Sequence, residues 1–206
     1  MATIQNLFDS GKGKLGNLVF YKVGGQGRVR TQAEHFHDRK SPAQLAQRQR
    51  LQVTTSFLKP FRDIIRITFA AEANGRSAVH AARAYNMRNA LTGEYPDISV
   101  EKSRALLSRG PLPVPVNAAV SAQPEGLLIE WDNSADAASH HPYDTLVVMA
   151  LSAETGRSDY LFTEARRSDG RYLWKTALPI GNALPDVWIT FRNRQETEMS
   201  NSMYAG

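Results

Sequence analysis

Hydrophobic residues follow two different periods along this chain, and the period changes at Glu94-Tyr95-Pro96-Asp97. Before this point, residues 42–93 place apolar side chains at helical spacing, for example at Phe61, Ile64 and Ile65. After it, short β-prone runs follow one another and are separated by turn residues. Helices first and many short strands afterwards predict an α+β protein.

The front of the chain contains a predicted β-hairpin. Two β-prone runs, residues 18–23 and 28–31, flank a glycine cluster at residues 24–27. Such runs around glycines are typical of a hairpin, because glycine adopts the backbone angles that tight turns need. Side chains alternate along a strand, so Arg28 and Arg30 should share one face of the second run.

Two or three helices should follow the hairpin. The motif Ser41-Pro42-Ala43-Gln44 combines a capping serine, a proline at the first helical position and a glutamine three residues after the cap. This helix is expected to reach Leu58, and Pro60 should break or kink it. A helical period continues beyond the proline until Asn74-Gly75, and a further helix is predicted over residues 77–91.

The rear of the chain is predicted to be all β. About seven short strands in roughly 100 residues are typical of an immunoglobulin or fibronectin III-like β-sandwich. We therefore expect a basic hairpin-plus-helix region at residues 1–96 and the sandwich at residues 97–206. The predicted strands cover residues 105–108, 116–122, 127–132, 145–152, 160–164, 172–177, 187–193 and 199–204.

Charge is distributed unevenly between the two parts. Residues 1–93 contain 15 Lys and Arg against 5 Asp and Glu, whereas residues 94–206 contain 10 against 15. This asymmetry indicates a polyanionic partner or a complementary surface on another molecule. The alternative is two solvated surfaces without a partner, since net charge also serves solubility.

Composition excludes several classes of function. The chain has no cysteine, so disulfides, thiolate metal sites and a cysteine nucleophile are excluded. No apolar run reaches the roughly 18–20 residues of a membrane span. Residues 1–17 lack the pattern of a secretory signal. The default expectation is a cytoplasmic protein without a membrane span, with export by another route left open.

Blocks spread over nearly the whole chain match a known pattern. These blocks are residues 13–19, 25–30, 44–48, 57–61, 84–90, 92–96, 108–113 and 200–206. On them the chain resembles an uncharacterised bacterial family that is common in Bacteroidetes. The resemblance implies a glycine-rich N-terminal hairpin, central helices and a C-terminal immunoglobulin- or fibronectin-like sandwich. The family has no assigned activity, so the resemblance implies no catalytic residues.

Basic and polar side chains of the front half are the candidate contacts for an anion or a partner. Two lysines lie in a glycine-rich loop, two arginines lie on the hairpin, and a polar stripe at i, i+4 and i+8 covers one side of the first helix. A flexible loop and a solvated helix face are the alternatives. The candidates are Lys12, Lys14, Arg28, Arg30, Gln44, Arg48, Arg50 and Gln52.

The sequence supports a metal, cofactor or catalytic site less well than it supports the basic contacts above. His35 and His37 have a spacing suited to Zn²⁺ or Ni²⁺, but a site needs a third ligand, and two exposed linker histidines are the preferred interpretation. The glycines at 11, 13 and 16 match the dinucleotide fingerprint only superficially, because a strand follows them. We predict no catalytic residue, metal or cofactor, and therefore no enzyme.

Two functions remain, from different classes. The first is a non-catalytic structural or assembly protein that forms homo-oligomers, with the basic half of one copy against the acidic sandwich of another in a head-to-tail, filament-like arrangement. The alternative is a protein that binds nucleic acid or another polyanion through its basic half. An enzyme ranks third, because no motif supports it.

Overall fold

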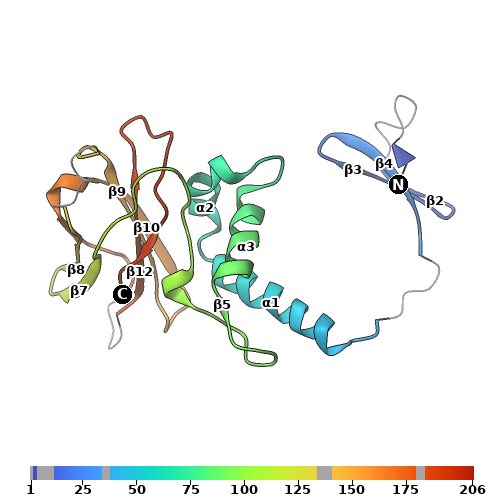
Figure 1. The fold of residues 1–206 in the computed structure, drawn as a ribbon, viewed down its shortest axis with the longest axis horizontal. Coiled ribbons are helices and arrows are strands. Elements are labelled where there is room, and N and C mark those ends of the chain that lie inside the picture. The colour runs from blue at the N-terminus through green and yellow to red at the C-terminus, as the bar shows by residue number, and fades with distance from the viewer. Residues whose placement is uncertain (1, 4–11, 34–37, 134–140, 180–183) are drawn as a thin grey trace. The chain divides into compact units, whose positions relative to one another are not determined.

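The computed structural model describes residues 2–3, 12–33, 38–133, 141–179 and 184–206 (Figure 1). The chain forms two compact units, Met1–Ser41 and Pro42–Gly206. The fold is a mixture of helices and antiparallel sheets, as predicted for an α+β protein. The domain boundary that we expected after residue 96 falls inside the second unit.

The first unit is a four-stranded antiparallel sheet in the order β1-β4-β3-β2. The predicted hairpin is confirmed as β3 and β4. Its turn uses Gly24 and Gly25, whose φ angles of 59° and 82° lie in the left-handed region that favours glycine. The strands are β1 (Ala2–Thr3), β2 (Gly13–Leu15), β3 (Leu18–Val23) and β4 (Gln26–Thr31).

The second unit begins with three α-helices, as predicted: α1 (Pro42–Leu58), α2 (Arg62–Thr68) and α3 (Ala78–Asn89). Pro60 separates α1 from α2 because its ring prevents the helix from continuing. Ser77 caps α3, where its side chain accepts a hydrogen bond from the His80 amide at 3.3 Å. Local signals therefore define these helix ends.

Two antiparallel sheets follow, in the orders β10-β9-β12-β13 and β11-β8-β7. A small ladder of β5 (Leu91–Thr92) and β6 (Ser99–Val100) precedes them. The strands of the two sheets are β7 (Ala119–Gln123), β8 (Gly126–Glu130), β9 (Thr145–Leu151), β10 (Ser158–Arg166), β11 (Arg171–Trp174), β12 (Asp186–Arg192) and β13 (Met203–Tyr204).

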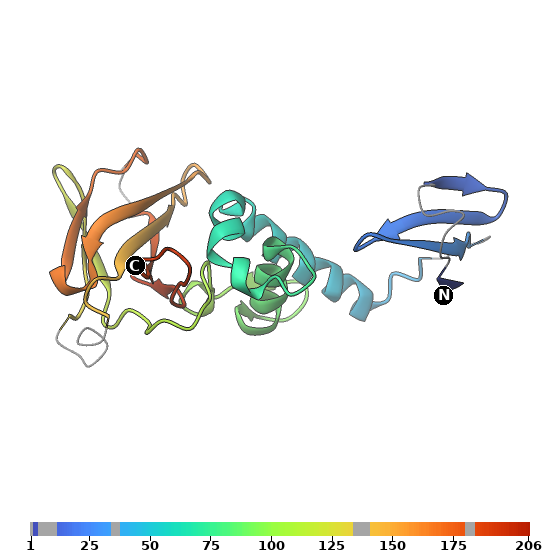
Figure 2. The same ribbon diagram turned by 90° about the horizontal axis from the view of Figure 1, so that it is seen from above.

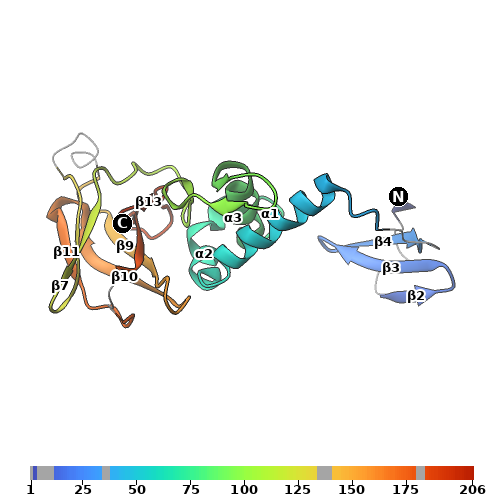
Figure 3. The same ribbon diagram turned by 90° about the horizontal axis from the view of Figure 1, so that it is seen from below.

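The four-stranded sheet of the second unit is covered on both faces. Alternation along β9 directs Val147 and Met149 towards the helices, where they share a core with Phe61, whereas Leu146 and Val148 point towards the three-stranded sheet. Figures 2 and 3 show the resulting order of layers within this unit: helices, four-stranded sheet, three-stranded sheet. The helices and the sheets therefore share a continuous packed unit.

Trp188 of β12 is the centre of the helix-to-sheet contact. Its ring packs edge-on against Phe61, with ring centroids 5.8 Å apart, and its indole nitrogen donates to the Lys102 carbonyl oxygen at 3.2 Å. The side chain is fully buried. A tryptophan that spans apolar and polar partners in this way fixes the position of the helices on the sheet.

The prediction of a strand over residues 105–108 is wrong. This segment forms no strand, and most of its backbone hydrogen bonds are made with side chains. Asn86 of α3 donates to the Leu106 carbonyl oxygen and accepts from the Leu106 amide, at 2.8 and 2.9 Å. The Leu107 amide donates to the Ser202 hydroxyl at 2.8 Å. The segment therefore ties α3 to the C-terminal end of the chain.

Candidate functional site

The register of the first unit places three of the predicted basic residues on one face of the sheet. Lys14 of β2 and Arg30 of β4 both pair with Val19, the residue between them in the ladder, and Arg28 pairs with Tyr21. Directly paired residues and residues two apart share a face. We call Lys14, Tyr21, Arg28 and Arg30 the cationic face. The fourth candidate, Lys12, precedes β2 and is exposed.

The opposite face of this sheet is mainly apolar, with Lys22 and Thr31 as its polar side chains. It carries Leu15, Leu18, Phe20 and Val29, which the same register brings to the other side, and we call these residues the apolar face. None of the residues 12–33 and 38–41 is buried. Leu15 is 69 % exposed and its partner Leu18 is 40 % exposed. The sheet therefore has no core of its own among these residues.

The other four predicted residues lie on α1, in the second unit, and all are exposed. Gln44, Arg48 and Gln52 form the expected stripe along the helix. Arg50 instead lines a cavity of about 450 Å³ together with Arg88 of α3. The eight candidates thus divide into two groups of four, one in each compact unit.

The structure contains a second group of cationic residues that the sequence analysis missed. Lys59, Arg62, Arg66 and Arg83 line a cavity of about 430 Å³ at the N-terminal end of α3, together with His80 and Ser77. We call this the helical cavity. These residues come from the end of α1, from α2 and from α3, so no single sequence motif joins them. One signal was available: residues 42–93 contain eight Lys and Arg but only two acidic residues.

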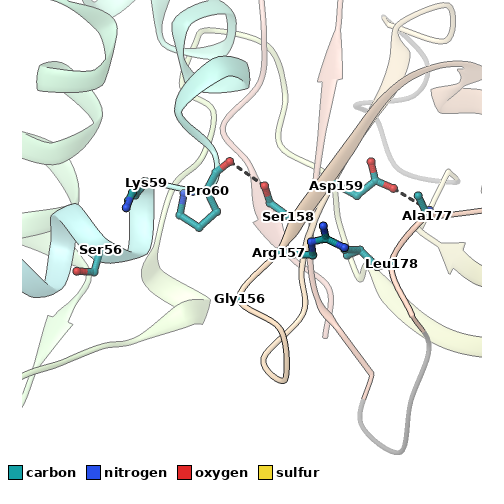
Figure 4. A pocket seen from close by; sticks show the side chains of 9 residues that line it. All are labelled: Ser56, Lys59, Pro60, Gly156, Arg157, Ser158, Asp159, Ala177 and Leu178. Carbon is teal, nitrogen blue, oxygen red and sulfur yellow. Dashed lines mark hydrogen bonds between the residues drawn. The ribbon is translucent and has the colours of Figure 1, made fainter.

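A larger cavity, of about 730 Å³, lies between the end of α1 and the start of β10 (Figure 4). Its polar groups hold the structure together: the Ser158 hydroxyl donates to the Pro60 carbonyl oxygen at 2.7 Å. Asp159 Oδ2 accepts from the Thr176 hydroxyl at 2.7 Å and from the Ala177 amide at 3.0 Å. A carboxylate engaged in this way orders a loop, and we assign it no catalytic role.

One buried ion pair stands out inside the two-sheet part. Arg167 is 2 % exposed, lies 3.5 Å from Asp144 Oδ2, donates to the Pro113 carbonyl oxygen at 2.8 Å and stacks 3.9 Å from the Phe191 ring centre. Burial raises the pKa of Asp144 and lowers the pKa of Arg167, although each charge opposes the shift of the other. With its guanidinium enclosed by protein, Arg167 acts as an internal brace.

A second polar cluster fixes the C-terminal strand. Asp186 accepts from the Tyr204 hydroxyl at 2.8 Å and from Lys102 Nζ at 2.8 Å. Burial, and then the bond to Asp186, raise the pKa of Tyr204 to about 12. The hydroxyl is therefore protonated at neutral pH and serves as a donor in the structure.

Neither a metal cluster nor a membrane span emerges from the part of the chain that the structure describes. Among those residues no three His, Asp or Glu side chains are grouped as metal ligands would be. No helix within the described ranges has the length and apolar character needed to cross a membrane. The predicted pair His35 and His37 lies outside the described residues.

Comparison with protein families identifies the family of this chain. The model of a family described as "Family of unknown function (DUF6266)" matches residues 10–206. The chain belongs to this family. The DUF6266 match covers β2, β3 and β4 of the first unit and the whole of the second unit. Comparisons with curated proteins and with solved structures gave no match.

Proposed function

We propose that this protein is a non-catalytic assembly protein that forms homo-oligomers through its N-terminal sheet. One observation carries the proposal: the sheet has no buried residue among residues 12–33 and 38–41. A sheet becomes more stable when its apolar face packs against another surface and is removed from water. The first unit therefore gains stability when a partner covers its apolar face.

The apolar face supplies the surface for that contact. Leu15 and Leu18 are cross-strand partners and are among the exposed large apolar residues of the chain. Burying a leucine side chain contributes about 1.5–3 kcal/mol. Strand β2 also lies at the edge of the sheet, and an open edge accepts a further strand from a neighbour.

Charge favours a second copy of the chain as the partner. The cationic face carries Lys14, Arg28 and Arg30, whereas residues 94–206 have five more acidic than basic residues. The first unit of one copy and the two-sheet part of the next are therefore opposite in charge, and this attraction acts between the copies while the apolar face forms the contact itself. A contact between unlike surfaces repeats head to tail and produces rings or filaments.

Light scattering on the purified full chain tests this proposal. We expect an oligomer at micromolar concentration whose mass decreases at high salt, because salt screens the contact between unlike charges. The variant Leu15→Ser/Leu18→Ser should shift the population towards monomer. Ile67→Ser is the matched control, since Ile67 of α2 is 51 % exposed and lies in the other unit. A chain that is monomeric at every concentration and ionic strength contradicts the proposal.

We infer further that the two-sheet part is a fibronectin type III-like sandwich. Numbered from β7 to β13, its seven strands form one sheet of strands five, two and one and a second of strands four, three, six and seven. This order supports the inference, because fibronectin type III domains have the same arrangement and belong to the antiparallel sandwiches. Such folds host many functions, so the sandwich itself assigns none.

One observation favours nucleic-acid binding as a second candidate function. Tyr21 lies on the cationic face beside Arg28, and aromatic rings among basic residues provide stacking platforms for single strands. Salt-titrated gel shifts with a single-stranded oligonucleotide test it. Lys14→Glu/Arg30→Glu should weaken binding and reduce the salt slope by about one to two. Arg171→Glu/Lys175→Glu, on or next to β11, is the control. Absence of binding at low ionic strength removes this candidate.

A further inference from the structure

The helical cavity combines a concave shape with charge of one sign. Four of its lining side chains, Lys59, Arg62, Arg66 and Arg83, are cationic at neutral pH, and the lining contains no carboxylate. Asp63 Oδ1 lies 3.3 Å from Arg66 Nη1 and neutralises part of one charge. Protein surfaces normally mix basic and acidic residues. A concave cluster of basic residues alone therefore attracts an anion.

The floor of the cavity is apolar. Leu58 is buried, Val79 and Ala78 are half-buried, and all three line the cavity. Apolar walls with a few convergent polar groups, in a volume of roughly 300–1,000 Å³, are typical of sites for small organic ligands. At about 430 Å³ this cavity is large enough for the organic part of such a ligand as well as its charged group.

The kinds of side chain around the cavity favour phosphate among anions. Arginine presents a planar fork of donors that matches two phosphate oxygens at once, and three of the four cations are arginines. The cavity also lies at the start of α3, a helix of 12 residues, where backbone amides and the helix dipole attract negative charge. Ser77 and His80 at that end supply further polar groups.

We propose that the helical cavity is a binding site for a phosphorylated small molecule of about the size of a nucleotide or sugar phosphate. Arg62, Arg66 and Arg83 bind the phosphate oxygens, Lys59 adds charge at the mouth, and Leu58 and Val79 contact the organic part. The site is separate from the sheet of the first unit, so it does not depend on the proposed assembly.

Isothermal titration calorimetry on the full chain at low ionic strength tests the site with pyrophosphate and adenosine monophosphate as probes. We expect saturable binding of both. Arg62→Gln/Arg83→Gln should weaken it by about tenfold or more, because two charge-assisted contacts are lost. The control Arg104→Gln/Arg171→Gln removes the same charge from η2 (Lys102–Arg104) and β11 and should change the affinity by less than about twofold.

Two further measurements separate loss of binding from loss of folding, and a small phosphorylated ligand from a nucleic acid. In the unsubstituted protein, pyrophosphate should shift the amide NMR signals of Ala78, Val79 and His80 before others, which needs no variant to fold. A short oligonucleotide is titrated in parallel as the other source of phosphate. Lack of binding by both small probes, equal loss in the control variant, or binding of the oligonucleotide alone each overturns the proposal.

Discussion

At the scale of single residues, Arg167 shows how an ion pair can brace two packed sheets without forming a binding site. Its guanidinium contacts the Asp144 carboxylate, the Pro113 carbonyl oxygen and the Phe191 ring, and its own carbonyl oxygen accepts from the Trp131 indole at 2.8 Å. These partners belong to different strands and loops of the two sheets. Removing only one charge therefore leaves the other buried without its main counter-charge.

We predict that Arg167→Met lowers the free energy of unfolding by about 3–5 kcal/mol, as measured by urea denaturation, because the buried Asp144 loses its arginine partner and keeps only the His141 ring, 3.6 Å from its Oδ2. The double variant Asp144→Asn/Arg167→Met should recover part of this loss. Arg171→Met, at an exposed position on β11, is the control and should change stability by less than about 0.5 kcal/mol. A neutral Arg167→Met variant shows that the pair contributes little to stability.

At the scale of elements, the sequence predicts what local chemistry decides. Ser77 caps α3, Pro60 separates α1 from α2, and the glycines at 24 and 25 form the hairpin turn, each by a preference that acts within a few residues. The error at residues 105–108 has the opposite origin. There the partners of the backbone are Asn86 and Ser202, which are distant in sequence, and an apolar run gives no sign of them.

The candidate sites also divide into those set by local sequence and those set by residues distant in sequence. Alternation along one strand correctly places Arg28 and Arg30 on one face, because the period of a strand is local. The helical cavity escaped prediction because Lys59, Arg62 and Arg83 meet only after α1, α2 and α3 have packed together. Charge counted over residues 42–93 is the strongest hint of this cavity that the sequence contains.

At the scale of the whole molecule, the two units differ in how they are stabilised. Both hydrophobic cores of the described structure lie entirely within Pro42–Gly206, where Phe61 and Trp188 anchor one and Trp131 and Phe191 the other. The first unit has only partly covered apolar residues over 12–33 and 38–41. The second unit therefore has the means to fold alone, whereas the first has no such core among these residues.

Deleting residues 1–41 separates the two proposals by experiment. We predict that the remaining chain keeps a cooperative thermal unfolding transition, because it retains both cores, and becomes monomeric in light scattering, because the apolar face is gone. It should still bind pyrophosphate, since every residue of the helical cavity lies after residue 41. An unfolded fragment contradicts the independence of the second unit, and an oligomeric fragment contradicts assembly through the sheet. A folded, monomeric fragment that no longer binds pyrophosphate means that the anion contacts belong to the first unit, where Lys14 and Arg30 lie.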